Sequence, residues 1–534
     1  MRRHISLLFI LMSVISISIA QTSSPNIEQA LKNIEEHEYA SAIKYLEMEL
    51  KQYPENQLVV MELLGYANYG NGNYAKAMSL FDQTIECGKG GDSIFLSTAY
   101  YHRAGLNSEI SDTIASIRDY LKSISYEPAN DKALTELAEI YFQTNQFEEA
   151  DKTFLKLIDV DSSNPYPYYG LARNAYNQGK FYEASDYIDK ASVLDEDKER
   201  ISIMKVRLGI ASKNWNKVLT ESLIVITQNS DNEEAYYGIL RSSDSIYDET
   251  IKMIKEKITN EPENGVWSFI LSHVYMRHEK YNEAILCLDR LQSNEEYRRI
   301  AFYWIGECYD KLDNQRLVIE TMNKAIKEDS TLVEYYLKRA DARFYEQELD
   351  EAEKDYKQII ELEKEYAYYS FYRLGWIREM QKRYNEALDY YNMSILLKED
   401  YAYAYMMKGN LLKDYFKDTS NATTSFKKCI ELDKGINEET CKQYAYLALG
   451  DTVKAIEITD SILKMTNDPG AYYDAACIYS RMGNKERAVI YLEQAFKKGY
   501  KKFKHILSDN DLENLRNYPE FENLLKKWRN KTLK

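Results

Sequence analysis

Apolar residues recur along most of this chain with the spacing of amphipathic helices, and polar turns interrupt them at regular intervals. The clearest example spans residues 131–164, DKALTELAEIYFQTNQFEEADKTFLKLIDVDSSN. Leu134, Leu137, Ala138 and Tyr141 lie at i, i+3, i+4 and i+7, and the period resumes after Asn145 with Phe147, Ala150, Phe154 and Leu157. Such a stripe gives each helix one apolar face. The pattern therefore predicts two helices joined by a turn near Asn145.

A small residue marks the second helix of each predicted hairpin and recurs about every 34 positions. This first ladder is Ala42, Ala77, Ser116, Ala150, Ala184, Val218, Thr250, Ala284, Val318, Ala352, Ala387, Ala422, Ala455 and Ala488. A second ladder lies 12 residues upstream over much of the chain: Gly65, Ala104, Ala138, Ala172, Val206, Gly238, Ser272, Gly306, Ala340, Gly375 and Ala476. A bulky residue where two helices approach closely would cost about 1–3 kcal/mol. The two ladders predict an all-α fold, an α-solenoid of about 14 stacked hairpins.

Departures from the period predict where the array is divided. The insertion CGKGGD at 87–92 separates repeats 1–2 (27–87) from repeats 3–6 (93–230). A shortened step in the first ladder favours a second seam near Ser230 and Asp231, before repeats 7–14 (231–500).

Two further stretches depart from the pattern within repeats. Val206 and Val218 occupy both small positions of one hairpin, so we expect less regular packing there. An extra residue appears near 416–421, and the following repeat has Gln443 in the small position. These stretches are candidate bends in the array.

The repeated unit resembles the tetratricopeptide repeat. Its pattern of an aromatic residue or Leu, Leu-Gly or Leu-Ala, Tyr, Ala, an aromatic residue and Ala is matched at several places. The best matches are Leu137-Ala138-Tyr141-Ala150-Phe154, Ile305-Gly306-Tyr309 with Ala325, Leu374-Gly375-Tyr384-Ala387-Tyr391, and Ala476-Tyr479-Gly483-Ala488-Ala495. The resemblance covers roughly Ile27 to Gly499. It implies a right-handed α-solenoid that binds a protein or peptide partner in its concave groove.

The end of the chain, residues 501–534, resembles the closing helices of some bacterial tetratricopeptide arrays. The matching residues are Leu512, Leu515, Arg516, Pro519, Phe521, Leu524 and Leu525. A terminal repeat needs a covering for its apolar face, so we expect capping helices here. The basic residues just before them, Lys497, Lys498, Lys501, Lys502 and Lys504, are interpreted as a solvated face.

The first 20 residues have the composition of a secretory signal peptide. Arg2 and Arg3 precede an apolar run from Ile5 to Ile19, and small residues lead to Ala20. We expect cleavage after Ala20, a short linker at 21–26, and a mature protein that is exported. If the source is bacterial, the expected location is periplasmic or associated with the cell envelope.

The charge balance argues against nucleic acid and bare anionic membrane as partners. Lys and Arg total 69 against 85 Asp and Glu, a net charge of −16; losing Arg2 and Arg3 leaves 67 against 85, or −18. Such an acidic surface repels phosphate. After signal cleavage no remaining stretch is long and apolar enough to span a membrane.

The six cysteines leave two interpretations open. Cys429 with Cys441, or Cys287 with Cys308, lie on helices that should be neighbours, and an exported location permits disulfides. Free buried thiols are the other interpretation, because a solenoid core of this size needs no covalent crosslink and Cys packs as a small apolar residue.

A search for catalytic or cofactor chemistry finds no motif. The string GKGG at 88–91 has no Ser or Thr after its Lys, no CxxC or GxSxG occurs, and the six His form no ligand cluster. We therefore expect no catalytic residue, no cofactor, no metal site and no enzymatic activity.

Tyrosine is abundant, with 48 residues against 16 Phe and 5 Trp. Several aromatic stripes fall on the side of the first helix that, by the resemblance, faces the groove. The candidate partner-binding residues are Tyr166, Tyr169, Arg173, Tyr176, Phe269, His273, Tyr369, Tyr372, Trp376 and Tyr403. Tyr combines a rigid ring with a hydroxyl at low entropic cost, which suits binding surfaces. The alternative is that these rings pack against neighbouring helices.

Taken together, these features predict an exported, non-catalytic scaffold that binds a protein partner, in a bacterial cell-envelope assembly or secretion complex. One alternative is a glycan-binding or polysaccharide-export scaffold, in which the Tyr stripes stack on sugar rings. Another is a regulatory subunit of an enzyme that resides in a different chain. The functional part of this prediction rests on fold analogy.

Overall fold

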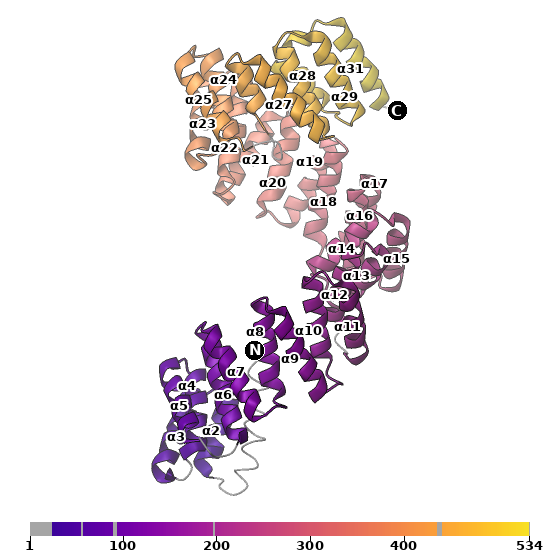
Figure 1. The fold of residues 1–534 in the computed structure, drawn as a ribbon. Coiled ribbons are helices and arrows are strands. Elements are labelled where there is room, and N and C mark those ends of the chain that lie inside the picture. The colour runs from indigo at the N-terminus through magenta and orange to yellow at the C-terminus, as the bar shows by residue number, and fades with distance from the viewer. Residues whose placement is uncertain (1–23, 55–56, 89–92, 196–197, 435–439, 533–534) are drawn as a thin grey trace. The chain divides into compact units, whose positions relative to one another are not determined.

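The computed structural model describes residues 24–54, 57–88, 93–195, 198–434 and 440–532 (Figure 1). The expected signal peptide and most of the 87–92 insertion lie outside these ranges. Within them the regular elements are helices, and no strand occurs. None of the described helices is both long and apolar enough to cross a bilayer.

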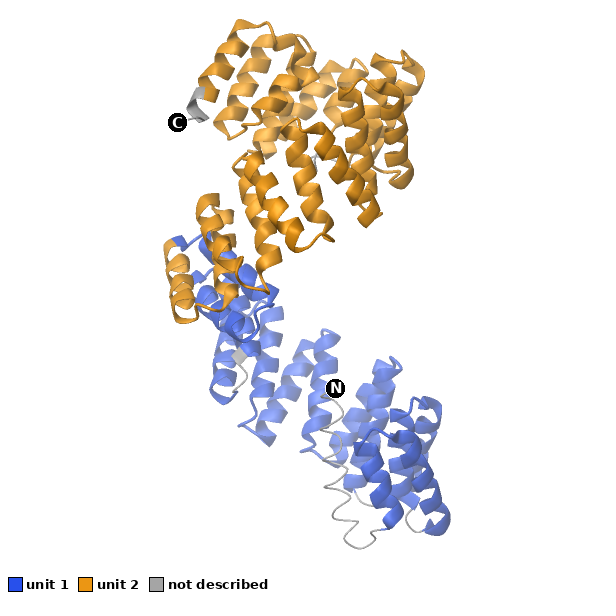
Figure 2. Cartoon of the chain, turned by 180° about the vertical axis from the view of Figure 1, so that it is seen from behind, with its two compact units in different colours: residues 1–247 blue, residues 248–534 orange. Residues whose placement is uncertain are grey.

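The chain divides into two compact units, residues 1–247 and 248–534 (Figure 2). The helices of the first unit are α2 (Pro25–Glu35), α3 (Tyr39–Gln52), α4 (Gln57–Gly70), α5 (Tyr74–Cys87), α6 (Ser93–Glu109), α7 (Thr113–Tyr126), α8 (Asp131–Gln143), α9 (Phe147–Val160), α10 (Pro165–Asn177), α11 (Phe181–Leu194), α12 (Lys198–Ala211), α13 (Trp215–Gln228) and α14 (Glu233–Ser243).

The second unit begins with α15 and ends with a short 3₁₀ helix and a final α-helix. Its elements are α15 (Tyr247–Asn260), α16 (Gly265–Arg277), α17 (Tyr281–Leu291), α18 (Arg298–Lys311), α19 (Gln315–Glu328), α20 (Val333–Tyr345), α21 (Leu349–Leu362), α22 (Ala367–Met380), α23 (Tyr384–Leu397), α24 (Ala402–Asp414), α25 (Thr419–Leu432), α26 (Lys442–Ala448), α27 (Thr452–Met465), α28 (Pro469–Arg481), α29 (Lys485–Lys497), α30 (Phe503–Ser508), η2 (Asn510–Leu515) and α31 (Pro519–Thr532).

Consecutive helices pair as hairpins within each unit, α2 with α3 through α12 with α13 in the first and α16 with α17 through α28 with α29 in the second. The second helix of a hairpin also packs on the first helix of the next one in the same unit. Between these two series, α14 and α15 are consecutive in sequence, and the division between the units falls at the start of α15. This repeated arrangement confirms the predicted all-α solenoid of helix-turn-helix repeats.

Both ladders lie where the paired helices meet. Every residue of the first ladder is at most 1% exposed, including the Ser, Thr and Val members. The second ladder is buried as well. At Gly375 the reason is explicit, because an added Cβ would lie 2.6 Å from the ring of Tyr391 on the partner helix. A large ring from one helix thus fills the space that the small residue of the other leaves.

The hairpin with valine at both small positions packs like the others. Val206 and Val218 are fully buried, and α12 and α13 form a hairpin of ordinary length. Gly209 faces Val218, since a Cβ there would lie 2.7 Å from a Val218 methyl group. The expected loss of regularity is therefore wrong, because a glycine on the facing helix makes room for the larger side chain.

A residue with left-handed backbone lies five positions before nearly every first-ladder residue, in the turn between two helices. These residues are His37, Gly72, Ser111, Asn145, Gly179, Lys213, Glu279, Asp313, Gln347, Lys382, Lys417, Gly450 and Gly483. At Asn145 (φ 59°) the following amide of Gln146 donates to the Tyr141 carbonyl at 2.8 Å. That bond satisfies a carbonyl which the end of the first helix leaves free.

The turn after α14 is the exception among the described turns that precede a first-ladder residue. Ser245, five positions before Thr250, does not have positive φ, and Ser245 and Ile246 both donate to the Ser242 carbonyl. The division between the units falls at this turn, one helix after the seam expected near Ser230 and Asp231. The shortened ladder step therefore reflects a turn of a different kind.

The C-terminal helices pack on the last hairpin. Their buried apolar residues Ile506, Leu512, Leu515, Phe521, Leu524 and Leu525 form one cluster with Tyr473, Cys477, Leu492 and Phe496 of α28 and α29. The end of the array is thus in contact with apolar side chains of residues 501–534.

Candidate partner-binding cavity

The first helices of successive hairpins in the second unit line one large cavity, with a volume of about 2410 Å³. On α22 the lining residues are Tyr369, Tyr372, Arg373 and Trp376, and on α24 they include Tyr403, Met407, Asn410 and Asp414. Residues three or four apart share one face of a helix. Each first helix therefore contributes one continuous stripe to the cavity wall.

The structure brings four of the ten sequence-predicted residues together in this cavity: Tyr369, Tyr372, Trp376 and Tyr403. The other six lie elsewhere. Tyr166, Tyr169, Arg173 and Tyr176 lie on α10 of the first unit, and Phe269 and His273 lie on α16 of the second unit without lining the cavity.

Tyr369 takes part in a buried charge network. The Arg373 Nε donates to its hydroxyl at 2.8 Å, and the hydroxyl donates to Asp341 at 3.1 Å. Arg373 Nη2 lies 2.9 Å from Asp341 Oδ1, and the guanidinium is 4.7 Å from the ring of Phe344 and 5.5 Å from that of Trp376. Burial raises the pKa of Tyr369 well above its usual value, so its proton stays in place. Tyr369 therefore has a packing role whether or not it also contacts a ligand.

Tyr372 lies at the centre of an aromatic cluster. Its ring centroid is 6.1 Å from that of Trp376, 5.5 Å from that of Tyr401 and 6.3 Å from that of Tyr403. Only 6% of Tyr372 is exposed. Packing accounts for this residue, while ligand contact by the more exposed rings of the cluster stays a prediction.

The α10 stripe of the first unit is held by ionic and cation–π contacts. Tyr166 donates a short hydrogen bond to Glu139, which also pairs with Arg173 at 2.6 Å. The Arg173 guanidinium stacks 3.8 Å from the ring of Phe142. Tyr169 faces Arg200 at 4.7 Å, and Tyr176 lies 5.5 Å from the ring of Phe181. These contacts hold α10 against α8, α11 and α12.

The predicted residues on α16, Phe269 and His273, form an aromatic contact with the next hairpin. The His273 ring lies 4.3 Å from Phe269 and 4.6 Å from Trp304 on α18. Burial lowers the pKa of His273 to about 4, so the imidazole is neutral at physiological pH. A neutral ring packed in this way holds α16 and α18 together.

The C-terminal segment contacts earlier helices of the same unit, and residues of 497–516 line the same cavity as α20 and α22. Lys502 Nζ lies 3.9 Å from the ring centroid of Tyr345, and Lys504 Nζ lies 2.6 Å from Glu346 Oε2. Burial opposes the charge of Lys502, but Tyr345, Asp310 and Asp313 outweigh it and raise the pKa of the ammonium.

The expectation of a solvated basic face is wrong for Lys502, the only one of the five lysines that is partly buried. The other four are exposed. The contact joins residues far apart in sequence, so a local pattern could not reveal it.

Carboxylates outnumber cations around the cavity, with 12 Asp and Glu against 9 Lys and Arg in its lining. Burial, together with nearby Asp414 and Asp511, raises the pKa of Glu379 to about 7. Burial and Asp509 likewise raise the pKa of Asp511. Burial is the main cause of both shifts, and the neighbouring carboxylates add to it. A cation entering the cavity would stabilise their charged forms.

Sequence reasoning missed two buried ionic networks, one in each unit. Asp119 accepts from Arg103 Nη2 at 2.7 Å, and Asp355 accepts from Arg339 Nη2 at 2.7 Å and from Arg343 at 2.6 Å. In both, an Arg on the first helix precedes the Asp on the second by 16 residues. That repeated spacing is a signal that could have found them.

Comparison with known proteins identifies the repeats directly. A tetratricopeptide repeat model matches residues 131–164, 402–435 and 469–497, and a second tetratricopeptide repeat model matches residues 337–405. The chain contains tetratricopeptide repeats. The match at residues 337–405 includes α22 and its cavity-lining stripe, so this part of the wall consists of tetratricopeptide repeats.

Three curated relatives share segments with this chain. A chloroplastic protein of Arabidopsis thaliana is 39% identical over 83 residues, which cover 15% of this chain and 25% of that protein. RNA polymerase II-associated protein 3 of Mus musculus is 26% identical over 149 residues, 28% of this chain and 21% of that protein. TPR repeat-containing protein MJ1428 of Methanocaldococcus jannaschii is 21% identical over 234 residues, 42% of this chain and 36% of that protein. The chain thus spans about a third or less of these relatives' length.

The solved structures that match this chain include the following two. The APC/C hetero-tetramer Cut9-Hcn1 is 14% identical, and the match covers 96% of this chain and 98% of that one, with a TM-score of 0.32. PilF of Pseudomonas aeruginosa is 14% identical, and the match covers 39% of this chain and 93% of that one, with a TM-score of 0.34.

Proposed function

We propose that this protein is a non-catalytic tetratricopeptide scaffold whose second unit binds an extended, Lys- or Arg-rich segment of a partner protein. Residues 501–534 would cover the end of the array. The observation that carries this proposal is the basic C-terminal segment of the chain itself, in which Lys502 lies against the ring of Tyr345 among the cavity-lining residues, and Asp310 and Asp313 favour its charge. The wall of the cavity therefore accommodates a lysine side chain.

Charge complementarity supports the choice of a basic partner. The lining carries more carboxylates than cations, and neighbouring carboxylates contribute to the raised pKa values of Glu379 and Asp511. Complementary charge across an interface favours encounter and selects among partners. One relative, RNA polymerase II-associated protein 3, is named for association with another protein, and the same broad class of role is proposed here.

The aromatic lining is less suited to a glycan. Sugar recognition by stacking needs an open ring face, whereas Tyr372 packs against three neighbouring rings and Tyr369 is fixed by Arg373 and Asp341. A polypeptide can bind the polar and acidic side chains of the lining without displacing these rings.

Reversing one carboxylate of the cavity tests the proposal. Asp414 is exposed and lines the cavity at the end of α24. We expect Asp414→Lys to weaken binding of a labelled Lys-rich peptide at least about tenfold, equivalent to about 1.4 kcal/mol, because like charges then meet. Fluorescence anisotropy with the full mature chain measures this, with a peptide carrying Glu at the same positions as reference.

The matched control is Asp389→Lys, at an exposed position of α23 that does not line the cavity. It makes the same change in net charge and should leave peptide affinity within about twofold. Equal effects of the two substitutions, or equal affinity for the Lys and Glu peptides, would contradict the proposal. Binding of neutral oligosaccharides that Asp414→Lys leaves unchanged would replace it with glycan recognition.

The cellular setting that we propose is outside the cytoplasm, periplasmic or associated with the cell envelope of a bacterium, in an assembly or secretion complex. The support is the basic, apolar and small-residue pattern of residues 1–20. N-terminal sequencing of protein recovered from cell fractions should give a chain that starts at Gln21. An intact Met1 in the soluble cytoplasmic fraction would contradict export.

A further inference from the structure

We propose that Cys429 and Cys441 form an intramolecular disulfide that ties the end of α25 to the start of α26. Their Sγ atoms lie 3.1 Å apart, and the two residues are 0% and 2% exposed. A disulfide needs its sulfurs about 2.05 Å apart. A shift of about one ångström, shared between two side chains, therefore suffices to form the bond.

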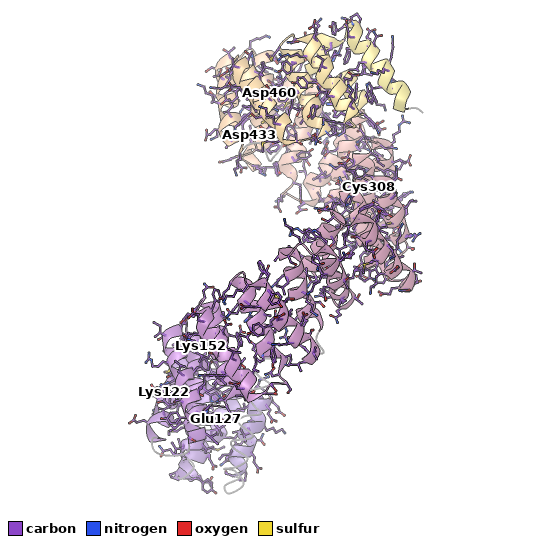
Figure 3. The ribbon with its side chains drawn as sticks, turned by 45° about the vertical axis from the view of Figure 1, so that its right-hand side comes forward. Lys122, Glu127, Lys152, Cys308, Asp433 and Asp460 are labelled. Atoms are coloured by element: carbon purple, nitrogen blue, oxygen red, sulfur yellow. The ribbon has the colours of Figure 1, made fainter. Side chains whose placement is uncertain are left out.

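Asp433 links the two cysteines through its side chain and its backbone. Asp433, at the end of α25, accepts hydrogen bonds from the backbone amides of Cys441 at 2.8 Å and Lys442 at 3.1 Å. Its own amide donates to the Cys429 carbonyl at 3.0 Å. Figure 3 labels Asp433 at this connection. Because Asp433 bonds to the start of α26 through its carboxylate and to Cys429 through its backbone amide, the approach of the sulfurs is part of the local fold.

The other cysteines are placed differently. Cys308 lies on α18, apart from Asp433 in Figure 3, and Cys287 lies on α17. Cys477 contacts the Asp509 carboxylate at 3.8 Å, and Cys87 is exposed on α5. The sequence left two pairings open, and only for Cys429 and Cys441 do the described residues give a sulfur–sulfur contact.

The bond would form by exchange with a disulfide oxidant, such as oxidised glutathione or a thiol oxidoreductase. One cysteine thiolate attacks the oxidant's disulfide, which gives a mixed disulfide and one released thiol. The second thiolate then displaces the remaining oxidant thiol. The two cysteines lose two electrons and two protons, and the oxidant disulfide becomes two thiols.

Oxidation would precede the burial of these thiols. The hydrogen bond to Cys429 and burial raise the pKa of Cys441, and the thiolate is the reactive form. A disulfide made during folding would be protected afterwards. It would fix the residues just beyond it, Gln443 and Tyr444, which line the partner-binding cavity.

Disulfide mapping of the full chain tests the inference. After refolding with oxidised and reduced glutathione, blocking of free thiols and proteolysis without reductant, we expect a linked peptide pair containing Cys429 and Cys441. The denatured protein should then titrate four of its six thiols. Six free thiols, or a linkage to any other cysteine, would overturn the assignment.

Variants separate the bond from the thiols themselves. The oxidised protein should melt about 5 °C above the reduced protein, because the bond restricts the unfolded chain. Cys429→Ala should abolish that difference, while Cys87→Ser, at an exposed thiol, should preserve it. If the oxidised and reduced forms of Cys429→Ala still melt at different temperatures, the stabilisation comes from a different cysteine pair. The linkage is decided by mapping of the unaltered chain, so the test does not depend on whether a variant folds.

Discussion

Replacing Asp355 with alanine is expected to lower the stability of the second unit by about 3–5 kcal/mol. Its side chain is 4% exposed and accepts from Arg339 and Arg343, whose charges are then left without their buried partner. Breaking a buried ion pair on one side costs far more than losing an exposed pair. Urea unfolding followed by tryptophan fluorescence measures the change, since four of the five Trp lie after residue 247.

Glu361→Ala provides the control on the same helix. Glu361 is exposed on α21, so its removal should change stability by no more than about 0.5 kcal/mol. An Asp355→Ala protein with a normal midpoint would mean that Arg339 and Arg343 find other partners. Asp119→Ala, in the corresponding network of the first unit, should leave the fluorescence transition of the second unit in place.

Gly375→Ala should destabilise the protein by about 1–3 kcal/mol, although alanine usually favours a helix over glycine. The added methyl group would lie 2.6 Å from the ring of Tyr391, which is fully buried and donates a hydrogen bond to Glu379 at 3.0 Å. The ring cannot withdraw without losing that contact. Thermal unfolding measured by circular dichroism gives the effect.

Gly105→Ala should have the opposite sign. Gly105 lies within α6, where a Cβ would meet only the Tyr120 hydroxyl at 3.7 Å, so the substitution should stabilise the helix by about 0.5–1 kcal/mol. Shrinking the opposing ring with Tyr391→Leu should make Gly375→Ala less costly in the double variant than alone. If Gly375→Ala and Gly105→Ala shift the melting temperature alike, close helix packing does not set the second ladder.

The array could be predicted from sequence because its determinants are local. Ala150 and Asn145 act within one hairpin, through helix contact and a left-handed turn, while the ring of Phe154 also packs on α10 of the next hairpin, and the pattern repeats about every 34 residues. Burial of the whole first ladder follows from this repetition. The valine pair at Val206 and Val218 was misjudged because the compensating residue, Gly209, lies outside both ladders.

The cavity was predictable only in part. The aromatic stripe at Tyr369, Tyr372 and Trp376 has the period of a helix face, but periodicity does not separate a cavity wall from a core. Whether these rings pack or stay open depends on their neighbours in three dimensions. Arg373 pairs with Asp341 on a neighbouring first helix, and the stripe alone does not show this pairing. The contact of Lys504 with Glu346 depends on the curvature accumulated over many hairpins, which no single repeat encodes.

The left-handed turns have a consequence for engineering. Nine of them, in the described part of the chain, carry a residue other than glycine, with side chains as different as those of His37, Lys213, Glu279 and Lys417. Such a backbone costs a residue with a Cβ roughly 1 kcal/mol that glycine avoids. Glycine at such a turn removes that cost but also gives the unfolded chain more freedom, so the net gain at each turn is smaller than the strain alone would give.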